Sequence, residues 1–245
     1  MSVDWHTVVV PVILFLSTCT RSTFGFGDAL VGMPLLAMAV GVKIAAPLIA
    51  LVSVTIAAAV VLKDWRSIHF KSACPLVLAS FAGIPIGIFF LTEADERIVK
   101  LILAVTVLAF AMFALTRPRL FVIRTDKPAL PFGFVAGILG GAYNAPGLLL
   151  VVYGTLRRWS AEQFRATLQG YFLPTSLLIL FGYGLRGLWV PDVFRYYLVS
   201  LPLIVPAILL GKTLNKRFQH RSFVFSVYVM LIVIGIMLLI EVGFP

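Results

Sequence analysis

Apolar residues run along the chain in eight long segments separated by short polar loops. The segments cover residues 8–41, 44–62, 73–91, 98–116, 129–155, 161–183, 193–211 and 222–242. Six of them are plain spans of about 20 residues, the length that an α-helix needs to cross a bilayer. The alternation of polar and apolar positions that a membrane β-barrel requires is absent from these runs. The pattern predicts an all-α polytopic membrane protein.

Two of the segments are unusual, and both contain glycines and polar residues near the middle. The first has 34 residues, 8–41, and includes TRSTFGFGDALVGMP at 20–34. As one straight helix it would measure roughly 50 Å, against a hydrocarbon core of about 30 Å. The fifth, residues 129–155, contains GGAYNAPG at 140–147. We therefore expect each segment to enter the membrane, turn at its glycines and return.

Composition supports the membrane assignment and removes other classes of protein. The chain is 61% hydrophobic and 12% charged, with a mean hydropathy of +1.05, whereas soluble domains carry about a quarter charged residues. The net charge of +10 reflects the basic loops of a membrane protein rather than a nucleic-acid partner. Lipid and a small solute are the expected partners, and a homodimer stays open as the assembly state.

The basic residues test how the two unusual segments run. If each segment crosses once, Lys and Arg divide almost evenly between the two faces. If each turns back, one face collects 13 of the 20 Lys and Arg and the other keeps 5, with Arg21 and Arg165 set aside as embedded. Basic loops face the cytoplasm, so we expect both termini outside it. No basic residue precedes Arg21, so this count is the same whether the first segment crosses the membrane or turns back. Only the length of the first segment indicates a hairpin.

An odd number of crossings follows each hairpin, so the two halves would face opposite ways as an inverted repeat. GFGDALVGMPLLAM at 25–38 and GGAYNAPGLLLVVY at 140–153 both run from glycines through a polar residue and a proline into an aliphatic stretch. We expect a single membrane transporter domain over residues 1–245. Its first repeat would be 1–116, its linker 117–128 and its second repeat 129–245.

Broken segments at matching positions of two halves indicate the midplane substrate site of a transporter. A helix that breaks inside the membrane presents unpaired N–H groups and the positive end of its dipole, which suit an anion. Irregular backbone at that depth needs protein or water around it, so we expect both breaks to face a central cavity. The candidate substrate-binding residues are Arg165, Asn144, Tyr143, Gln169, Gly25, Gly27, Gly141 and Arg21.

Several candidates have two interpretations. Arg21 and Asp28 either neutralise each other or handle substrate and protons, since a carboxyl buried alone favours its protonated form. Arg165 either faces the substrate or pairs with Glu162 near the interface. Asn144 either reaches the substrate or satisfies the backbone of its own break. The glycines of GIPIG, residues 83–87, indicate close helix packing instead of a ligand site.

An intramembrane enzyme would need a nucleophile with a base, paired carboxylates or a metal cluster inside the spans. His6, His69 and His220 all fall near the predicted interfaces. We therefore expect no enzyme activity, no cofactor and no metal. Broken helices can also form a channel filter, so an anion channel remains an alternative, as does a transporter of a small molecule without sulfur.

The chain resembles the TauE/SafE sulfite-exporter family, also called the four-toluenesulfonate uptake permeases. The residues that carry the resemblance are MPLLAMAVG after the first break, KIAAPLIALVSV, KDW at 63–65, GAYNAPGLLLVVY and FRATLQGYFL. The resemblance covers nearly the whole chain and implies transport of sulfite, sulfoacetate or organosulfonates across the bacterial inner membrane, coupled to protons. GFGD stands here where the family usually has a longer glycine run.

Overall fold

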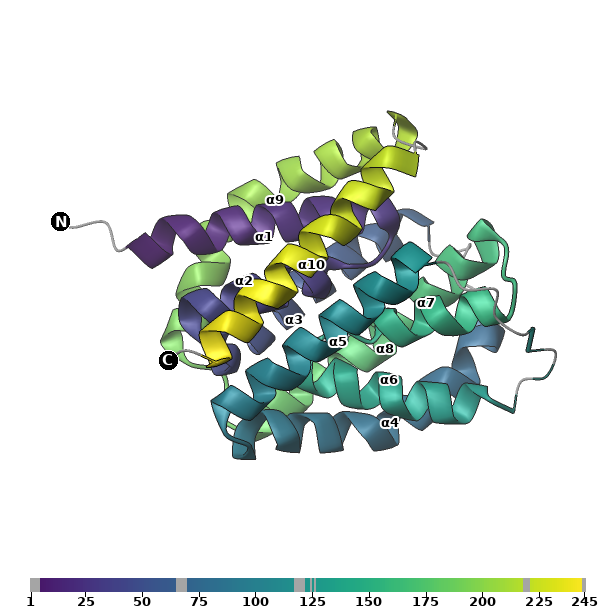
Figure 1. Cartoon of the computed structure of the whole chain (residues 1–245), viewed down its shortest axis with the longest axis horizontal. Helices are drawn as coiled ribbons and strands as arrows, with labels where there is room; N and C mark the ends of the chain where they lie inside the picture. The colour runs from purple at the N-terminus through teal and green to yellow at the C-terminus, as the bar shows by residue number, and fades with distance from the viewer. Residues whose placement is uncertain are drawn as a thin grey trace. The chain divides into compact units, whose positions relative to one another are not determined.

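The computed structural model describes most of the chain. The described residues are 5–64, 70–116, 122–123, 125, 127–217 and 221–243. Within these ranges the regular structure consists of ten α-helices, without a strand (Figure 1). This confirms the prediction of an all-α fold.

The helices follow the apolar segments closely, with two helices in each of the two unusual segments. In chain order they are α1 (Trp5–Phe24), α2 (Asp28–Val40), α3 (Val42–Asp64), α4 (Phe70–Glu93), α5 (Glu96–Thr116), α6 (Ala129–Tyr143), α7 (Gly147–Leu156), α8 (Ala161–Leu185), α9 (Pro191–Arg217) and α10 (Arg221–Gly243).

Several helices have the length and composition to cross a membrane. In the described part of the chain four qualify on both counts, namely Trp5–Phe24, Ala73–Glu93, Glu96–Thr116 and Pro191–Leu214. On α5, Ile98, Leu101, Ile102 and Val105 are exposed and share one helical face. A helix that is apolar on its outer face as well as its buried face is suited to lipid. The chain is a multi-pass membrane protein.

The first unusual segment is broken, as predicted. α1 ends at Phe24 and α2 begins at Asp28. Between them, Gly25 has φ +86° and Gly27 has φ +98°, a left-handed conformation that side chains with a Cβ rarely adopt. A Cβ on Gly32 would meet Ser17, so the start of α2 lies against the last turns of α1.

The second unusual segment is also broken, within its GGAYNAPG stretch. α6 ends at Tyr143 and α7 begins at Gly147, and the left-handed residue is Asn144, with φ 53°. Gly140 and Gly141 lie inside α6. The break thus comes after Gly140 and Gly141, at Asn144, and it ends at Pro146 and Gly147. Asparagine tolerates the left-handed conformation better than most residues.

The helices form two compact units. The first contains Met1–Ile49, Glu93–Pro118 and Trp189–Pro245, and the second contains Ala50–Thr92 and Arg119–Leu188. Each unit includes helices from both predicted repeats.

In the first unit, α1 packs along α9, α5 packs along α10, and α2 lies against α1, α10 and α5. The α1–α9 contact is close: a Cβ on Gly211 would meet the Cys19 carbonyl oxygen and the Ser22 side chain. The Thr23 hydroxyl lies 3.3 Å from the Gly211 carbonyl oxygen. The first arm of the broken segment is therefore held against a helix from the second half of the chain.

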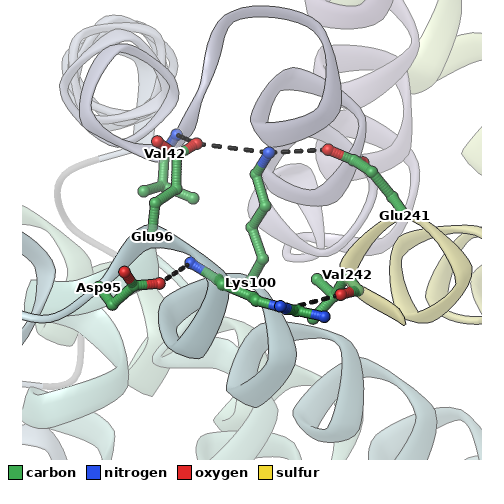
Figure 2. A network of polar contacts seen from close by, with 7 residues as sticks. Val42, Asp95, Glu96, Lys100, Glu241 and Val242 are labelled. Carbon is green, nitrogen blue, oxygen red and sulfur yellow. Dashed lines mark hydrogen bonds and ion pairs between the residues drawn. The ribbon is translucent and has the colours of Figure 1, made fainter. Parts of the chain in front are cut away.

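A polar network joins the start of α5 to the end of α10 in the same unit (Figure 2). Lys100 Nζ lies 2.7 Å from Glu241 Oε1 and 3.3 Å from Glu96 Oε1. Arg97 Nε donates a hydrogen bond of 2.8 Å to the Val242 carbonyl oxygen. Lys100 and Arg97 both belong to the face to which the charge count assigns only 5 basic residues. Each of them binds a protein group in this network.

In the second unit, α4 and α6 approach backbone to backbone. A Cβ on Gly83 would meet the Phe134 carbonyl oxygen, and one on Gly87 would meet that of Ile138. In the opposite direction, a Cβ on Gly141 would meet the Ile84 carbonyl oxygen. This interlocking confirms that the glycines of GIPIG serve close helix packing.

Candidate functional site

The first break holds a buried ion pair. Arg21, in the last turn of α1, donates a hydrogen bond from Nη1 to Oδ2 of Asp28 at 2.6 Å. The two side chains are 5% and 6% exposed. The Ser17 hydroxyl donates to the Asp28 backbone carbonyl at 2.9 Å. Arg21 and Asp28 thus neutralise each other across the break, whereas a role in binding stays a prediction.

The position of Asp28 adds a second favourable interaction. It is the first residue of α2, where the positive end of the helix dipole stabilises a carboxylate. A buried pair is costly to dehydrate, and removal of one partner leaves an uncompensated charge that costs about 3–5 kcal/mol. The pair therefore fastens α2 to α1 strongly in the conformation seen here.

The glycines of the first break use their backbone groups locally. The Gly25 amide donates to the Arg21 carbonyl oxygen at 2.6 Å, and the Gly27 carbonyl accepts from Val31 N at 3.3 Å. Gly27 is the N-cap of α2 and has no side chain to occupy the space in front of the helix. We expected Gly25 and Gly27 to offer N–H groups to a substrate, and this remains a prediction.

A cavity of about 90 Å³ adjoins the first break within the first unit. Its lining is almost entirely apolar and aromatic. The residues that line it are Thr20, Phe24, Phe26, Gly27, Leu30, Val31, Phe110, Val227, Tyr228 and Leu231. Arg21 and Asp28 do not line this cavity. The first break therefore combines a charged pair with an apolar cavity that is lined by other residues.

The second break is held by a hydrogen-bonded asparagine. The Asn144 amide nitrogen Nδ2 donates to the Tyr183 hydroxyl at 3.1 Å, and that hydroxyl donates to the Gly141 carbonyl oxygen at 2.9 Å. The Asn144 backbone N–H also bonds the Gly140 carbonyl at 2.9 Å, which closes the end of α6. Asn144 therefore satisfies its own break, and its second predicted role, binding substrate, is compatible with this position.

The remaining candidates are placed as follows. Tyr143 is buried in the last turn of α6, with 1% of its surface exposed. Gly141 lies in the same helix against the Ile84 carbonyl. Arg165 and Gln169 belong to α8, but their side chains lie outside the described part of the structure. The structure thus brings Asn144 and Gly141 together through Tyr183, and Arg21 together with Asp28.

Tyr183 was missed by the sequence analysis, which treated residues 161–183 as a plain span. Its side chain is fully buried, as is that of Tyr171, which lies about three turns earlier on the same helix. A tyrosine inside an apolar span needs a hydrogen-bond partner for its hydroxyl. This requirement could have indicated that the Tyr183 hydroxyl bonds another polar group, although the identity of that group depends on the fold.

Among the described residues, no three His, Cys, Asp or Glu side chains gather closely enough to hold a metal ion.

Comparisons with known proteins complete the description of the site. Neither the curated proteins nor the solved structures gave a match to this chain. The family model described as "Sulfite exporter TauE/SafE" matches residues 10–238, a range that includes both breaks and nearly the whole chain. That description is of a transporter family, in agreement with the apolar helices. The chain belongs to the TauE/SafE sulfite exporter family.

Proposed function

We propose that the protein is a secondary transporter of small anions, sulfite or organosulfonates, that works by alternating access. The observation that carries the proposal is the pair of helix breaks, one between α1 and α2 and one between α6 and α7. Each break holds buried polar side chains within a segment that is otherwise apolar.

The physical support comes from the cost of irregular backbone in a membrane. Non-helical backbone at membrane depth is tolerated where protein or water surrounds it, and transporters use it to bind their substrates. Left-handed residues occur at both breaks, Gly25 and Gly27 in the first and Asn144 in the second. A plain structural helix would have no need for either interruption.

Packing within each unit supports the inverted repeat. α1, the first arm of one broken segment, packs on α9, while α6, the first arm of the other, packs on α4. Counted from its own break, α9 holds the same position in the second repeat as α4 holds in the first. Both contacts are made at glycines, which is what two copies of one helix arrangement would produce.

The expected substrate is an anion because the breaks offer positive potential. The amino-terminal end of α2 carries the positive end of its dipole, and Arg21 beside it would add its charge whenever Asp28 is protonated. We propose that Asn144, Arg165 and the backbone near Gly25, Gly27 and Gly141 contact the substrate, with Tyr143 and Gln169 nearby. Asp28 would accept a proton during the cycle and so couple transport to the proton gradient.

The membrane and the orientation belong to the same proposal. We expect the protein in the bacterial inner membrane with both termini outside the cytoplasm, because the predicted cytoplasmic loops carry most of the Lys and Arg. A reporter fused to Pro245 tests this orientation, since activity of the reporter in the cytoplasm would overturn the charge count.

Uptake of labelled sulfite and of a labelled sulfonate into proteoliposomes tests the function. Saturation and counterflow support a carrier, whereas unsaturable flux at far higher unitary rates would establish a channel. Asn144→Ala and Arg165→Ala should each raise the half-saturating concentration about tenfold or more, as expected for hydrogen bonds to a charged group. Arg195→Ala is the control, because Arg195 is exposed on α9. Unchanged affinity in both test variants would remove these residues from the site.

A further inference from the structure

The cavity beside the first break has a chemistry that charge recognition does not explain. Its ten lining residues include two hydroxyl side chains, Thr20 and Tyr228, and no charged group. The Thr20 hydroxyl donates to the Leu16 carbonyl of its own helix at 2.9 Å. An apolar lining of this kind favours apolar groups over water.

Three aromatic rings give the cavity a defined wall. Phe26, in the break itself, meets Phe110 edge to face with ring centroids 6.4 Å apart. Phe110 in turn meets Tyr228 with centroids 6.2 Å apart and the same kind of contact. Aromatic pairs prefer such edge-to-face contacts, so the three rings support one another along one wall of the cavity.

We propose that this cavity is a subsite for a short alkyl group of the transported anion, and that it selects among anions by their carbon chain. The inference rests on the proposed transport of organic anions. The cavity reaches Gly27, the N-cap of α2, so an anion attracted to that helix end has its carbon chain beside the cavity. The charge of Arg21 is already matched by Asp28, which leaves apolar contact as the means of discrimination at this break.

The size of the cavity narrows the class of ligand. A water molecule accounts for about 30 Å³ of liquid, and an engineered apolar cavity of about 150 Å³ holds benzene. At about 90 Å³, this cavity is too small for an aromatic ring and suits a chain of about three carbons. The preferred anion therefore has a short aliphatic chain, in contrast to bare sulfite or an arylsulfonate.

The test is a binding series at constant head group on the purified full-length protein, read by thermal shift and by competition with labelled propanesulfonate. Methane-, ethane-, propane-, butane-, hexane- and benzenesulfonate are the probes. Affinity should rise about threefold to fourfold with each methylene up to propane- or butanesulfonate, as burial of one methylene predicts. Hexane- and benzenesulfonate should then bind more weakly than propanesulfonate.

Two variants that change the cavity in opposite directions make the assignment specific. Val227→Phe fills the cavity and should move the preference towards methanesulfonate, whereas Phe110→Leu enlarges it and should move the preference towards hexane- and benzenesulfonate. A loss of folding cannot produce both shifts. Val233→Phe is the matched control, because Val233 is exposed on α10 and does not line the cavity.

The outcomes separate this inference from the proposed function. If sulfonates bind but their affinity is independent of chain length in all variants, the alkyl group does not enter the cavity and the subsite is overturned. If neither sulfite nor any sulfonate binds or is transported, the proposed function itself fails. A chain-length optimum that moves in opposite directions in Val227→Phe and Phe110→Leu supports both.

Discussion

Arg21 and Asp28 are joined by a 2.6 Å hydrogen bond between oppositely charged groups, across the break that separates α1 from α2. Both side chains are almost fully buried, and the six residues between them include both left-handed glycines. The pair therefore holds the geometry of the break, and its removal should affect stability before it affects anything else.

Asp28→Asn should lower the free energy of unfolding by about 3–5 kcal/mol, because Arg21 keeps its charge in a buried place without a counterion. Arg21→Gln should cost a similar amount. The double variant should lose much less than the sum of the two, and thermal unfolding in detergent would measure all three. Additive losses would show that the two side chains do not act as a pair.

The same double variant separates the two roles left open for Asp28. If the pair is purely structural, a folded Arg21→Gln/Asp28→Asn protein should transport sulfonate with normal affinity and normal dependence on the proton gradient. If Asp28 carries the coupling proton, uptake by the double variant should no longer respond to that gradient. Proteoliposomes with and without an imposed pH difference provide the measurement.

Tyr183→Phe should weaken both stability and substrate affinity. The change leaves the Asn144 amide and the Gly141 carbonyl without the hydroxyl that joins them, a loss of about 1–3 kcal/mol for buried polar groups. Tyr171→Phe is the control, since Tyr171 is equally buried on α8 and its hydroxyl lies 2.7 Å from Ser80 Oγ instead of a break. Tyr171→Phe should reduce stability but leave the half-saturating concentration unchanged.

A double-mutant cycle between Tyr183→Phe and Asn144→Ala strengthens this test. Residues in one hydrogen-bond network show interaction energies of about 0.5–3 kcal/mol, so the combined loss should fall short of the sum. An equal loss of affinity in Tyr171→Phe and Tyr183→Phe would mean that any damage to α8 weakens binding, and Tyr183 would then have no special role.

Gly141→Ala and its neighbour Gly140→Ala should have opposite effects. A Cβ at Gly141 would collide with the backbone of α4 at Ile84, and such overpacking costs about 1–3 kcal/mol or more. A Cβ at Gly140 would find its nearest neighbours, Ile179 and Pro146, at 3.5 Å and 3.6 Å. Alanine there gains up to about 1 kcal/mol of helix propensity. In thermal unfolding, the Tm of Gly141→Ala should therefore lie below that of the wild type, and the Tm of Gly140→Ala above it.

Lys100→Met should loosen the junction between α5 and α10. The change removes the ammonium group that Glu96 and Glu241 share, at a cost of about 1 kcal/mol, because the carboxylates are partly exposed and screened. The effect should diminish at high salt. Lys212→Met, at an exposed position on α9, is the comparison, and an equal loss there would show that the network adds nothing.

Much of the fold could be predicted because lipid imposes a simple rule on the sequence. Each apolar run needs a helix to satisfy its backbone, and the eight runs became helices with ends close to those expected. The first break was visible for the same reason: Gly25, Gly27 and Asp28 interrupt a run that is too long for one crossing. These are local features, and a single sequence is enough to read them.

The parts that escaped prediction depend on contacts between residues far apart in the chain. Gly141 resembled a turn residue, yet it packs against Ile84 of α4, and the left-handed residue of the turn is Asn144. Likewise Tyr183 lies 39 positions from its partner Asn144. The residues next to Gly141 and Tyr183 in the sequence do not indicate these distant partners. A glycine that packs against another helix therefore could not be distinguished from one that makes a turn.

The meshing of α4 with α6, and of α1 with α9, also bears on how the polypeptide is made. Each contact joins a helix from residues 1–116 to one from residues 129–245. When the ribosome has delivered only the first stretch, the face of α1 that contacts α9 and the face of α4 that contacts α6 are open to lipid. Completion of the protein therefore waits on its last helices, and either fragment expressed alone would have to borrow its counterpart from another molecule.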